Sequence, residues 1–505
     1  MIYIEYMIKI TDGGSLFFEQ SRFNRERREV TQGKFSTSLR FARTIRLVIM
    51  SHLQIAYIFL AFLVFFAKVL PASAASLTVC ASGCNVTSIQ TAVDIASLGN
   101  DILVKNGSYS GVTINKMVIL TGENIDANDP RNNGATINGQ VIVTGNFTFG
   151  QEPLVKGFRI IGGTDPVVIQ NSVMTIENSY IKGTGGDGVS INTGGAIIRG
   201  NRIESGGDDG IDVDSQNKSV IIENNYIVFS GQDGIEIRQQ PVTLASRISM
   251  WIRGNRIEGS GEDGLQIMDY GNFSNRKYVI ERNLFLYNTK AAIGLNIGQN
   301  TNQSYEAAPM PEPLYAVNNT FFQNDAGISG GANLIAINNI FTGQNTFDLK
   351  NVTGKSVVKH SFFSATPHLV GVNNFDNSTT QIGNPMLDAS YFLQPGSPAI
   401  DRGIPSYQHT YNYDGSGGGS AQTVTEFAIN LNSSQYTGSA PDLGWKESGM
   451  VGNTPTPTPQ GPTATRTPTP ISGVPTATRT PTPRPGTPTP TPRQGMCVFW
   501  RGYGN

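Results

Sequence analysis

Charge, cysteine and histidine are all scarce in this chain of 505 residues. Charged residues make up 15% of it and the formal net charge at pH 7 is −1, so we expect no nucleic-acid partner. Histidine occurs four times and never within the repeats described below. There are three cysteines: Cys80 and Cys84 can close a small disulfide loop in an exported protein and are too few for a metal site, while Cys497 stands alone.

The N-terminal region contains one unbroken apolar run, Ile55–Ala67, followed by Ala72-Ser73-Ala74. This pattern predicts a signal peptide over residues 50–74, cleaved before Ala75. The run is short for a membrane span of about 20 residues, although an uncleaved anchor is the alternative. Residues 1–49 then form a doubtful leader or an over-extended start. We therefore expect a secreted or cell-surface protein with no membrane span after cleavage.

The C-terminal region is a Thr-Pro repeat that fills most of residues 451–495. Proline at this density favours polyproline II and cannot form a packed core. Roughly 40 residues at about 3.1 Å each would reach on the order of 120 Å, which predicts a stalk. The remaining residues 496–505 are too short to fold alone. Residues 75–450 are left for a folded domain, and we expect a monomer.

Glycine is abundant, with 57 residues, and a repeated Asp-Gly box dominates the stretch Met174–Ile297. The boxes follow one another at spacings of 22, 24 and 30 residues and alternate with short strand-like segments. This periodicity predicts a solenoid. A short amphipathic helix over residues 87–96, starting with Thr87 and Gln90 as a capping box, should close its N-terminal end. The boxes contain Asp187, Asp209, Asp233 and Asp263.

The helix, the segment NDILVKNGSYSGVTINK and the repeats together resemble the pectin-lyase-like superfamily. The later segments NPMLDASYFLQPGSPAIDRG and APDLGWKE are similar to the endings of many secreted bacterial members. The resemblance covers about Leu77–Glu447. It implies an all-β fold, a right-handed parallel β-helix of about ten or more coils. It leaves the activity open, because the superfamily includes lyases, hydrolases, epimerases and non-catalytic adhesins.

Stacking the repeats predicts columns of side chains about 4.8 Å apart on adjacent coils. An inward isoleucine column forms the core, and an asparagine column should hydrogen-bond along the stack. Two outward columns alternate Glu with Arg and Tyr with Arg, and we interpret them as devices that keep the register. The asparagine column comprises Asn201, Asn225, Asn255, Asn283, Asn319 and Asn339.

The Asp-Gly boxes have two interpretations. In the structural one, the glycines take positive φ and each aspartate hydrogen-bonds its own turn. In the other, the stacked carboxylates bind Ca²⁺, which would relieve their repulsion. The glycines are Gly188, Gly210, Gly234 and Gly264, and the candidate calcium ligands are Asp208, Asp209 and Asp233.

The strand after each box is the face on which the repeats differ, and four insertions follow it. Insertions on one face of a solenoid often build its binding face. Carboxylates there should be about 5 Å apart between coils and about 7 Å apart along one strand, which spans the separations in glycosidases. The catalytic candidates are Asp212, Asp214, Glu236 and Arg238. The substrate-binding candidates are Gln266, Asp269, Tyr270 and Tyr305.

Two chemistries fit this face. The segment GGDDGIDV resembles the aspartate motif of polygalacturonases, with Asp187 and the pair Asp208–Asp209 in the motif positions, but the Gly-His-Gly and Arg-x-Lys motifs of that family are missing. A pectate-lyase-like β-elimination would use Ca²⁺ on this face and Arg238 as the base, unless Arg238 only pairs with its acidic neighbours. We expect an extracellular polysaccharide as partner; the alternative is a non-catalytic, adhesin-like β-helix on a stalk.

Overall fold

The computed structural model describes residues 6–10, 16–20, 76–214, 217–239, 247–269, 273–297, 310–413 and 422–449. The predicted signal peptide, the Thr-Pro stalk, Tyr270 and Tyr305 lie outside these residues. No helix within the described ranges is long and apolar enough to cross a membrane. Outside the domain, β1 (Tyr6–Ile10) and β2 (Leu16–Gln20) form an antiparallel pair.

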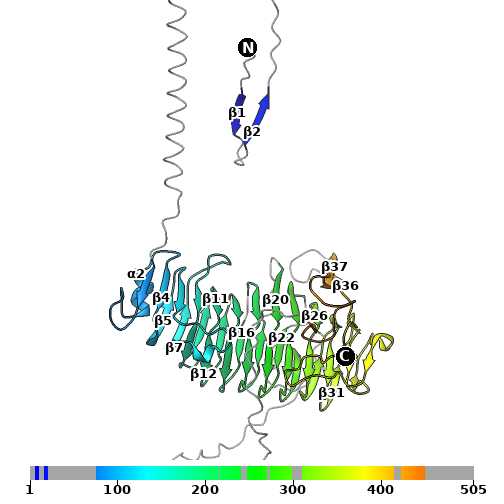
Figure 1. The fold of residues 1–505 in the computed structure, drawn as a ribbon. Coiled ribbons are helices and arrows are strands. Elements are labelled where there is room, and N and C mark those ends of the chain that lie inside the picture. Colours follow the sequence, from blue (N-terminus) through cyan, green and yellow to red (C-terminus); the bar gives the residue numbers. More distant parts are fainter. Residues whose placement is uncertain are drawn as a thin grey trace, which may run out of the picture.

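The strands from residue 77 to residue 382 wind into a right-handed parallel solenoid of about 11 turns, with strands of successive turns side by side (Figure 1). This confirms the predicted all-β, parallel β-helix fold. A typical turn contributes one strand to each of three parallel rows, which we call sheets 1, 2 and 3. Sheets 2 and 3 are joined through the long strands β5 (Gly107–Ile114) and β7 (Ala135–Val143).

The bounds of the remaining elements follow. Sheet 1 contains β3 (Leu77–Val79), β4 (Asp101–Val104), β6 (Ile119–Gly122), β8 (Leu154–Lys156), β11 (Val173–Glu177), β14 (Gly195–Arg199), β17 (Val220–Glu223), β20 (Ile248–Arg253), β23 (Arg276–Glu281), β26 (Leu314–Val317), β29 (Leu334–Ile337) and β32 (Val357–Lys359). Sheet 2 contains β9 (Phe158–Ile161), β12 (Tyr180–Gly183), β15 (Arg202–Ser205), β18 (Tyr226–Val228), β21 (Arg256–Glu258), β24 (Leu284–Leu286), β27 (Thr320–Phe322), β30 (Ile340–Thr342), β33 (Phe362–Phe363) and β35 (Gln381–Ile382). Sheet 3 contains β10 (Val167–Gln170), β13 (Val189–Asn192), β16 (Ile211–Asp214), β19 (Ile235–Arg238), β22 (Leu265–Asp269), β25 (Ala291–Ile297), β28 (Ala326–Ser329), β31 (Phe347–Lys350) and β34 (Leu369–Val370). The helices are α2 (Ile89–Ile95), η1 (Pro130–Asn132) and η2 (Asn377–Thr379).

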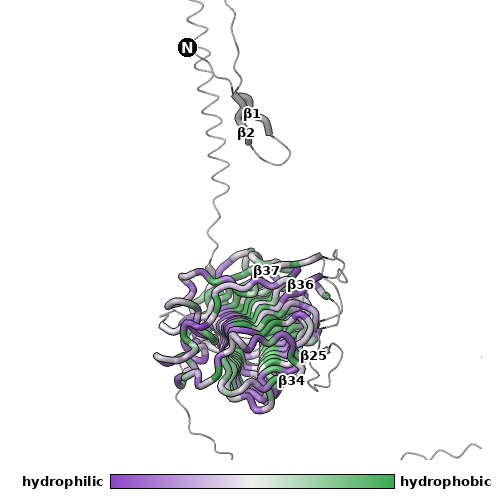
Figure 2. The backbone as a smooth tube through the Cα atoms, turned by 90° about the vertical axis from the view of Figure 1, so that its right-hand side faces the viewer, coloured by the Kyte–Doolittle hydropathy of each residue, from purple (hydrophilic) through white to green (hydrophobic). Residues whose placement is uncertain are grey.

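The core runs along the solenoid axis as stacks of identical or similar side chains, and hydrophobic residues line the inside of the coils (Figure 2). The predicted isoleucine column lies in register on sheet 1 and is fully buried. Nearer the C-terminus, Phe285, Phe321, Phe341 and Phe363 form a stack with ring centroids 5.4, 4.7 and 4.9 Å apart. Each coil therefore buries its apolar face against its neighbours.

The asparagine column forms the predicted ladder. The Nδ2 of Asn255, for example, donates to Asn283 Oδ1 at 3.0 Å and to the Ile222 carbonyl at 2.8 Å, and the same pattern links the column from Asn201 to Asn339. The residue preceding each of these six asparagines adopts positive φ, as at Asn224 and Gly254. The ladder thus satisfies the backbone of a tight left-handed turn.

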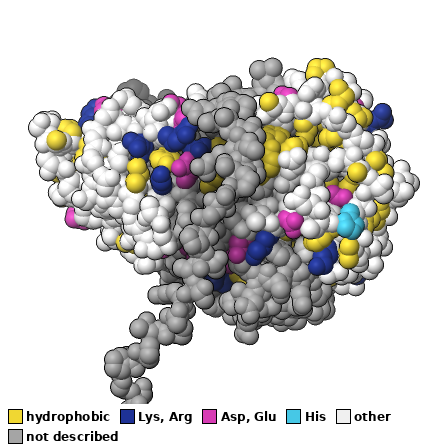
Figure 3. All heavy atoms as spheres, turned by 90° about the horizontal axis from the view of Figure 1, so that it is seen from below, with side chains coloured by type: hydrophobic (Ala, Val, Ile, Leu, Met, Phe, Trp, Pro, Cys, Tyr) yellow, Lys and Arg dark blue, Asp and Glu magenta, His cyan; other side chains and the backbone are white. Residues whose placement is uncertain are grey.

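The two alternating columns also lie in register. Arg199 Nε donates to Glu177 at 2.6 Å, and Arg253 pairs with Glu223 on the next two coils at 2.7 Å. The guanidinium carbons of Arg202 and Arg256 lie 4.5 and 5.0 Å from the centroid of the ring of Tyr226, which they enclose. These contacts belong to sheets 1 and 2. The part of the described surface seen in Figure 3 is mostly uncharged, with acidic and basic side chains close to one another.

A helix packs on the N-terminal coils, and a hairpin packs on the side of the solenoid. Helix α2 begins after the N-cap Ser88, not Thr87 as the sequence suggested, because the Ser88 hydroxyl accepts from the Thr91 N–H. The structure joins Cys80 and Cys84 in a disulfide. Near the C-terminus, the antiparallel hairpin β36 (Ser406–Tyr413) and β37 (Gln422–Asn430) packs on the outer face of sheet 1. Its Glu426 binds Arg247, Lys277 and Tyr315.

Candidate functional site

The Asp-Gly boxes lie in the turns between sheets 2 and 3 and form a second ladder. Each aspartate carboxylate accepts a hydrogen bond from the backbone N–H of the equivalent aspartate one coil further on, with distances of 3.2, 2.8 and 2.6 Å. The ladder begins one coil earlier, at Asp165, and ends at the N–H of Ala291. The aspartates therefore join coils, rather than capping their own turns as predicted.

The box glycines do not have the conformation that we expected. None of the four is among the described glycines with positive φ. Glycine is needed there for space: a Cβ on Gly234 would lie 2.5 Å from Ile257 Cγ2 and 2.6 Å from the Gly264 carbonyl oxygen. Gly188 and Gly210 meet the same obstruction from the next coil. The close approach of successive turns, which a sequence pattern cannot measure, excludes a side chain.

Immediately after the boxes, sheet 3 presents two outward columns. Strand pairing aligns Ser190, Asp212, Glu236 and Gln266 in the first column and Asn192, Asp214, Arg238 and Met268 in the second. The predicted catalytic residues are therefore adjacent. The first column is nevertheless enclosed, since Asp212 and Glu236 are 5% and 7% exposed and Gln266 is fully buried.

Arg238 is held by three carboxylates. Its Nε donates to Asp214 Oδ1 at 2.9 Å, its Nη2 donates to Glu236 Oε2 at 2.8 Å, and the same Nη2 lies 3.6 Å from Asp212 Oδ1. Although burial opposes the charge, the acidic neighbours raise the pKa of Arg238 above its ordinary value. This guanidinium is a poor general base, which counts against the predicted role of Arg238 in β-elimination.

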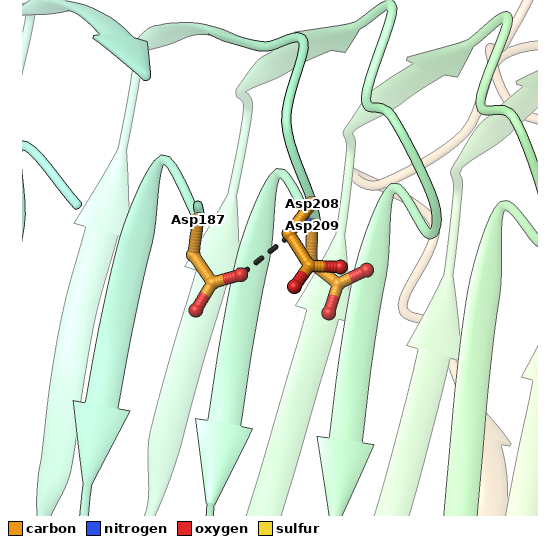
Figure 4. A group of neighbouring side chains, drawn as sticks. All are labelled: Asp187, Asp208 and Asp209. Carbon is orange, nitrogen blue, oxygen red and sulfur yellow. Dashed lines mark hydrogen bonds between the residues drawn. The ribbon is translucent and has the colours of Figure 1, made fainter. Parts of the chain in front are cut away.

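Two groups of three carboxyl side chains each have one oxygen per residue within 4.8 Å of the others. Asp187, Asp208 and Asp209 form the first, and Figure 4 shows these carboxyl groups pointing to the same side from two successive coils. Asp209, Asp212 and Glu236 form the second. Either arrangement supplies the oxygen ligands that Ca²⁺ prefers. Asp233, a predicted calcium ligand, belongs to neither group and serves the ladder.

Burial and mutual repulsion favour the protonated forms of these carboxyls. Burial, with smaller contributions from neighbouring carboxylates, raises the pKa of Asp187 to about 7 and that of Asp212 to about 8. The same causes raise the pKa of Asp209 to about 11 and that of Asp233 to about 9. Burial also raises the pKa of Glu236, although Arg238 and a hydrogen bond from Asp209 oppose this. The site thus combines carboxylic acids and carboxylates near neutral pH.

Some polar atoms on this face have no protein partner. The amide of Gln266 is buried with neither its nitrogen nor its oxygen bonded, whereas Asp212 Oδ1 accepts no hydrogen bond but lies 3.6 Å from Arg238 Nη2. Burying such groups without partners is costly, and native proteins rarely do so. A ligand with hydroxyl groups, which both donate and accept hydrogen bonds, would satisfy them.

Asp269 was predicted to contact substrate, but its carboxylate serves the interior. It is 3% exposed and accepts a hydrogen bond of 2.7 Å from Tyr278, with Arg276 Nη1 3.9 Å away. Glu312, which closes the last of the insertions, is buried beside it and accepts from Ser274. These groups hold together the ends of the insertions where they join the coils. The sequence did not predict this role, because it depends on the contact between β22, β23 and β26.

The stacked coils, ladders and strand rows define a right-handed parallel β-helix. Residues 167–384 match the family described as the right handed beta helix region, which agrees with the parallel β-helix that the structure shows. No curated protein sequence matches the chain.

Solved structures resemble the fold at low identity. Pectate lyase Pel9A is 16% identical, with 71% of this chain and 90% of that chain covered and a TM-score of 0.41. The catalytic domain of Agl-KA is 13% identical, covering 58% and 62% of the two chains with a TM-score of 0.29. The A-module of mannuronan C-5 epimerase AlgE4 from Azotobacter vinelandii is 13% identical, covering 59% and 92% with a TM-score of 0.27. These similarities concern the fold alone.

Proposed function

We propose that this β-helix engages an extracellular polysaccharide along the sheet 3 face from Ser190 to Gln266, and hydrolyses it. The observation that carries the proposal is the enclosed outward column, in which the whole amide of Gln266 has no partner, beside closely spaced carboxyls. Sugars offer hydroxyl groups that both donate and accept hydrogen bonds. Export to the extracellular side is part of the proposal and rests on the apolar run Ile55–Ala67.

Hydrolysis by carboxyl groups is better supported than β-elimination by Arg238. Asp187, with its pKa raised to about 7 by burial, can hold a proton near neutral pH and donate it to the glycosidic oxygen as the C–O bond breaks. Asp208, whose carboxyl oxygen lies within 4.8 Å of that of Asp187, is at the short separation of a retaining pair and would attack the anomeric carbon as the leaving group departs. Water, deprotonated by Asp187, would then hydrolyse the glycosyl ester and release Asp208. Arg238 positions its acidic neighbours.

We also propose Ca²⁺ as a ligand of Asp209, Asp212 and Glu236, whose oxygens lie close enough to share one ion. A bound cation would neutralise these carboxylates and could contact sugar oxygens. Nothing in the proposed hydrolytic step depends on it.

Product analysis tests the proposal. The domain should release reducing ends from at least one polymer in a broad polysaccharide panel, without forming ultraviolet-absorbing unsaturated products. Asp187→Asn and Asp208→Asn should each lower this activity at least about 100-fold, since general acid–base groups typically contribute 10²–10⁴-fold. Glu223→Gln, on sheet 1 and away from this face, is the matched control and should leave the rate unchanged.

A non-catalytic surface protein is the second candidate, favoured by the enclosure of Asp212 and Glu236. It predicts binding without cleavage, and binding that survives Asp187→Asn. Formation of ultraviolet-absorbing unsaturated products would indicate β-elimination and would overturn the hydrolytic assignment.

A further inference from the structure

The single arginine on the candidate face is already committed to the protein. Arg238 Nε donates a hydrogen bond to Asp214 at 2.9 Å, and its Nη2 donates one to Glu236 at 2.8 Å. Recognition of a sugar carboxylate commonly uses a bidentate contact from a guanidinium. A uronate would have to displace two carboxylates that are fixed on adjacent strands, so Arg238 is poorly placed to bind one.

The insertions that border this face add no basic group for a uronate. In sequence, the insertions Ser215–Ser219, Gln239–Ser249, Asp269–Lys277 and Gly298–Pro313 contain four basic residues. Lys218 donates to the Phe147 carbonyl at 2.7 Å, and Arg247 and Lys277 both pair with Glu426 of the C-terminal hairpin. Arg276 is fully buried, with Nη1 3.9 Å from Asp269. Within the described residues, these cations therefore face protein groups.

Carboxyl groups outnumber basic groups at this face. Two groups of three carboxyls share Asp209 and lie within one or two coils of each other, with Asp214 beside them. A polymer with one carboxylate per sugar would bring negative charge into this enclosed region. Burial there already disfavours the charged forms of Asp209 and Asp212, so a further ionised group without a cation would be costly.

The unpartnered atoms match hydroxyl groups. The buried amide of Gln266 offers both a donor and an acceptor, and Asp212 Oδ1 offers an acceptor. A hydroxyl group both donates and accepts, whereas an ionised carboxylate only accepts and would leave the Gln266 amide oxygen without a donor.

From the committed arginine, the paired cations of the insertions and the unpartnered amide, we infer that the polysaccharide bound on this face is an uncharged, hydroxyl-bearing polymer and not a polyuronate. This inference rests on the proposed polysaccharide function and names its substrate class.

Matched polymer pairs test the inference. The domain is titrated in EDTA with a neutral glucan, galactan and mannan, and with each polymer after stepwise oxidation of C6 to the carboxylate. For any backbone that binds, complete oxidation should weaken affinity at least tenfold, and added salt should recover part of the loss because it screens repulsion. Tighter binding of an oxidised polymer would overturn the inference and leave the proposed function standing.

Two further results complete the test. Failure to bind either form of every backbone overturns the proposed function, and the inference with it. If added Ca²⁺ makes an oxidised polymer bind more tightly than its neutral parent, the ligand is a polyuronate held through the cation and the inference is wrong. The neutral parent should remain the better ligand in both EDTA and Ca²⁺.

A variant connects the preference to Arg238. Asp214→Asn removes the carboxylate that holds Nε and should narrow the affinity ratio between neutral and oxidised polymer by about threefold or more. Glu223→Gln breaks an equivalent Glu–Arg pair on sheet 1, at 2.7 Å from Arg253, and should leave the ratio unchanged. An unchanged ratio in Asp214→Asn would show that Arg238 does not set the preference.

Discussion

The backbone N–H of Asp233 donates a 2.8 Å hydrogen bond to the carboxylate of Asp209, its equivalent one coil earlier. One carboxylate oxygen of Asp209 therefore accepts a hydrogen bond that joins two coils. The same side chain also belongs to both clusters of three carboxyl residues at the candidate site. The same aspartate thus fixes the spacing of the coils and places the neighbouring acids. Asp209 therefore has both a structural role and a place at the candidate site.

The box glycines should not tolerate a methyl group. Gly234→Ala places a Cβ 2.5 Å from Ile257 Cγ2 and 2.6 Å from a carbonyl oxygen of the next coil, so we expect a loss of about 2 to 3 kcal/mol in unfolding free energy. Gly206→Ala is the control, because its Cβ meets nothing within 4 Å. Equal Tm values for the two variants in thermal unfolding would contradict the close-approach explanation.

The asparagine ladder should be sensitive to loss of its donors. Asn255→Asp removes the N–H groups that reach Asn283 and the Ile222 carbonyl, and it buries a carboxylate beside acceptors. We expect a loss of roughly 3 kcal/mol or more, measured by urea unfolding. The exposed Asn217→Asp should change stability by less than about 0.5 kcal/mol. A small effect in Asn255→Asp would mean that the ladder is dispensable.

Gln266 should trade stability against binding. Because its buried amide has no partner, Gln266→Leu should raise Tm slightly, by the equivalent of about 1 kcal/mol, and weaken polysaccharide binding. Gln344→Leu is the informative contrast, since the Gln344 amide accepts from Asn324 and donates to the Phe321 carbonyl, and its loss should destabilise the fold. Destabilisation by Gln266→Leu would show that the amide supports the protein itself.

His409 should make the C-terminal hairpin sensitive to acid. Burial, assisted by Lys355 and opposed by Glu426, lowers the pKa of His409 from 6.5 to about 4. The unfolded chain therefore binds the proton more readily, so stability is complete above about pH 6.5 and falls as pH drops towards 4, by about 3 kcal/mol in total. Urea unfolding at pH 7 and pH 4 should show this difference reduced in His409→Gln. A pH dependence that persists unchanged in the variant would assign it to other groups.

Calcium binding can be measured without any substrate. If Asp209, Asp212 and Glu236 hold Ca²⁺, the ion should raise Tm relative to EDTA in the wild-type domain, because a ligand of the native state alone stabilises it. Glu236→Gln should abolish most of this shift, and Glu223→Gln should preserve it. Identical Tm values in Ca²⁺ and EDTA for the wild-type domain would remove calcium from the proposal.

The fold was predictable because its determinants repeat. A coil spacing of 22 to 30 residues and aligned columns of Ile, Asn, Glu and Arg are visible in the sequence, and the structure places them in register. The ladder's first member was missed because Asp165 precedes Pro166 instead of glycine, although its spacing of 22 residues to Asp187 was a usable signal.

The site was predictable only in part. Strand pairing brings Asp212, Glu236 and Gln266 together as the alternation implied. The depth of their enclosure and the inward role of Asp269 depend on packing between segments that are distant in the chain. The carboxylate that would hold Arg238 was left undecided between Asp214 and Glu236, and the structure shows that both do.

The alternation of Glu177, Arg199, Glu223, Arg253 and Glu281 also limits how such a chain can grow during evolution. A duplicated coil carries its own asparagine, aspartate and glycine, so it could join the stack and lengthen the face by about 4.8 Å. A single added coil would, however, place Arg beside Arg or Glu beside Glu. Gene duplication should therefore be retained most readily in steps of two coils, and the length of the sheet 3 face would change in increments of about 10 Å.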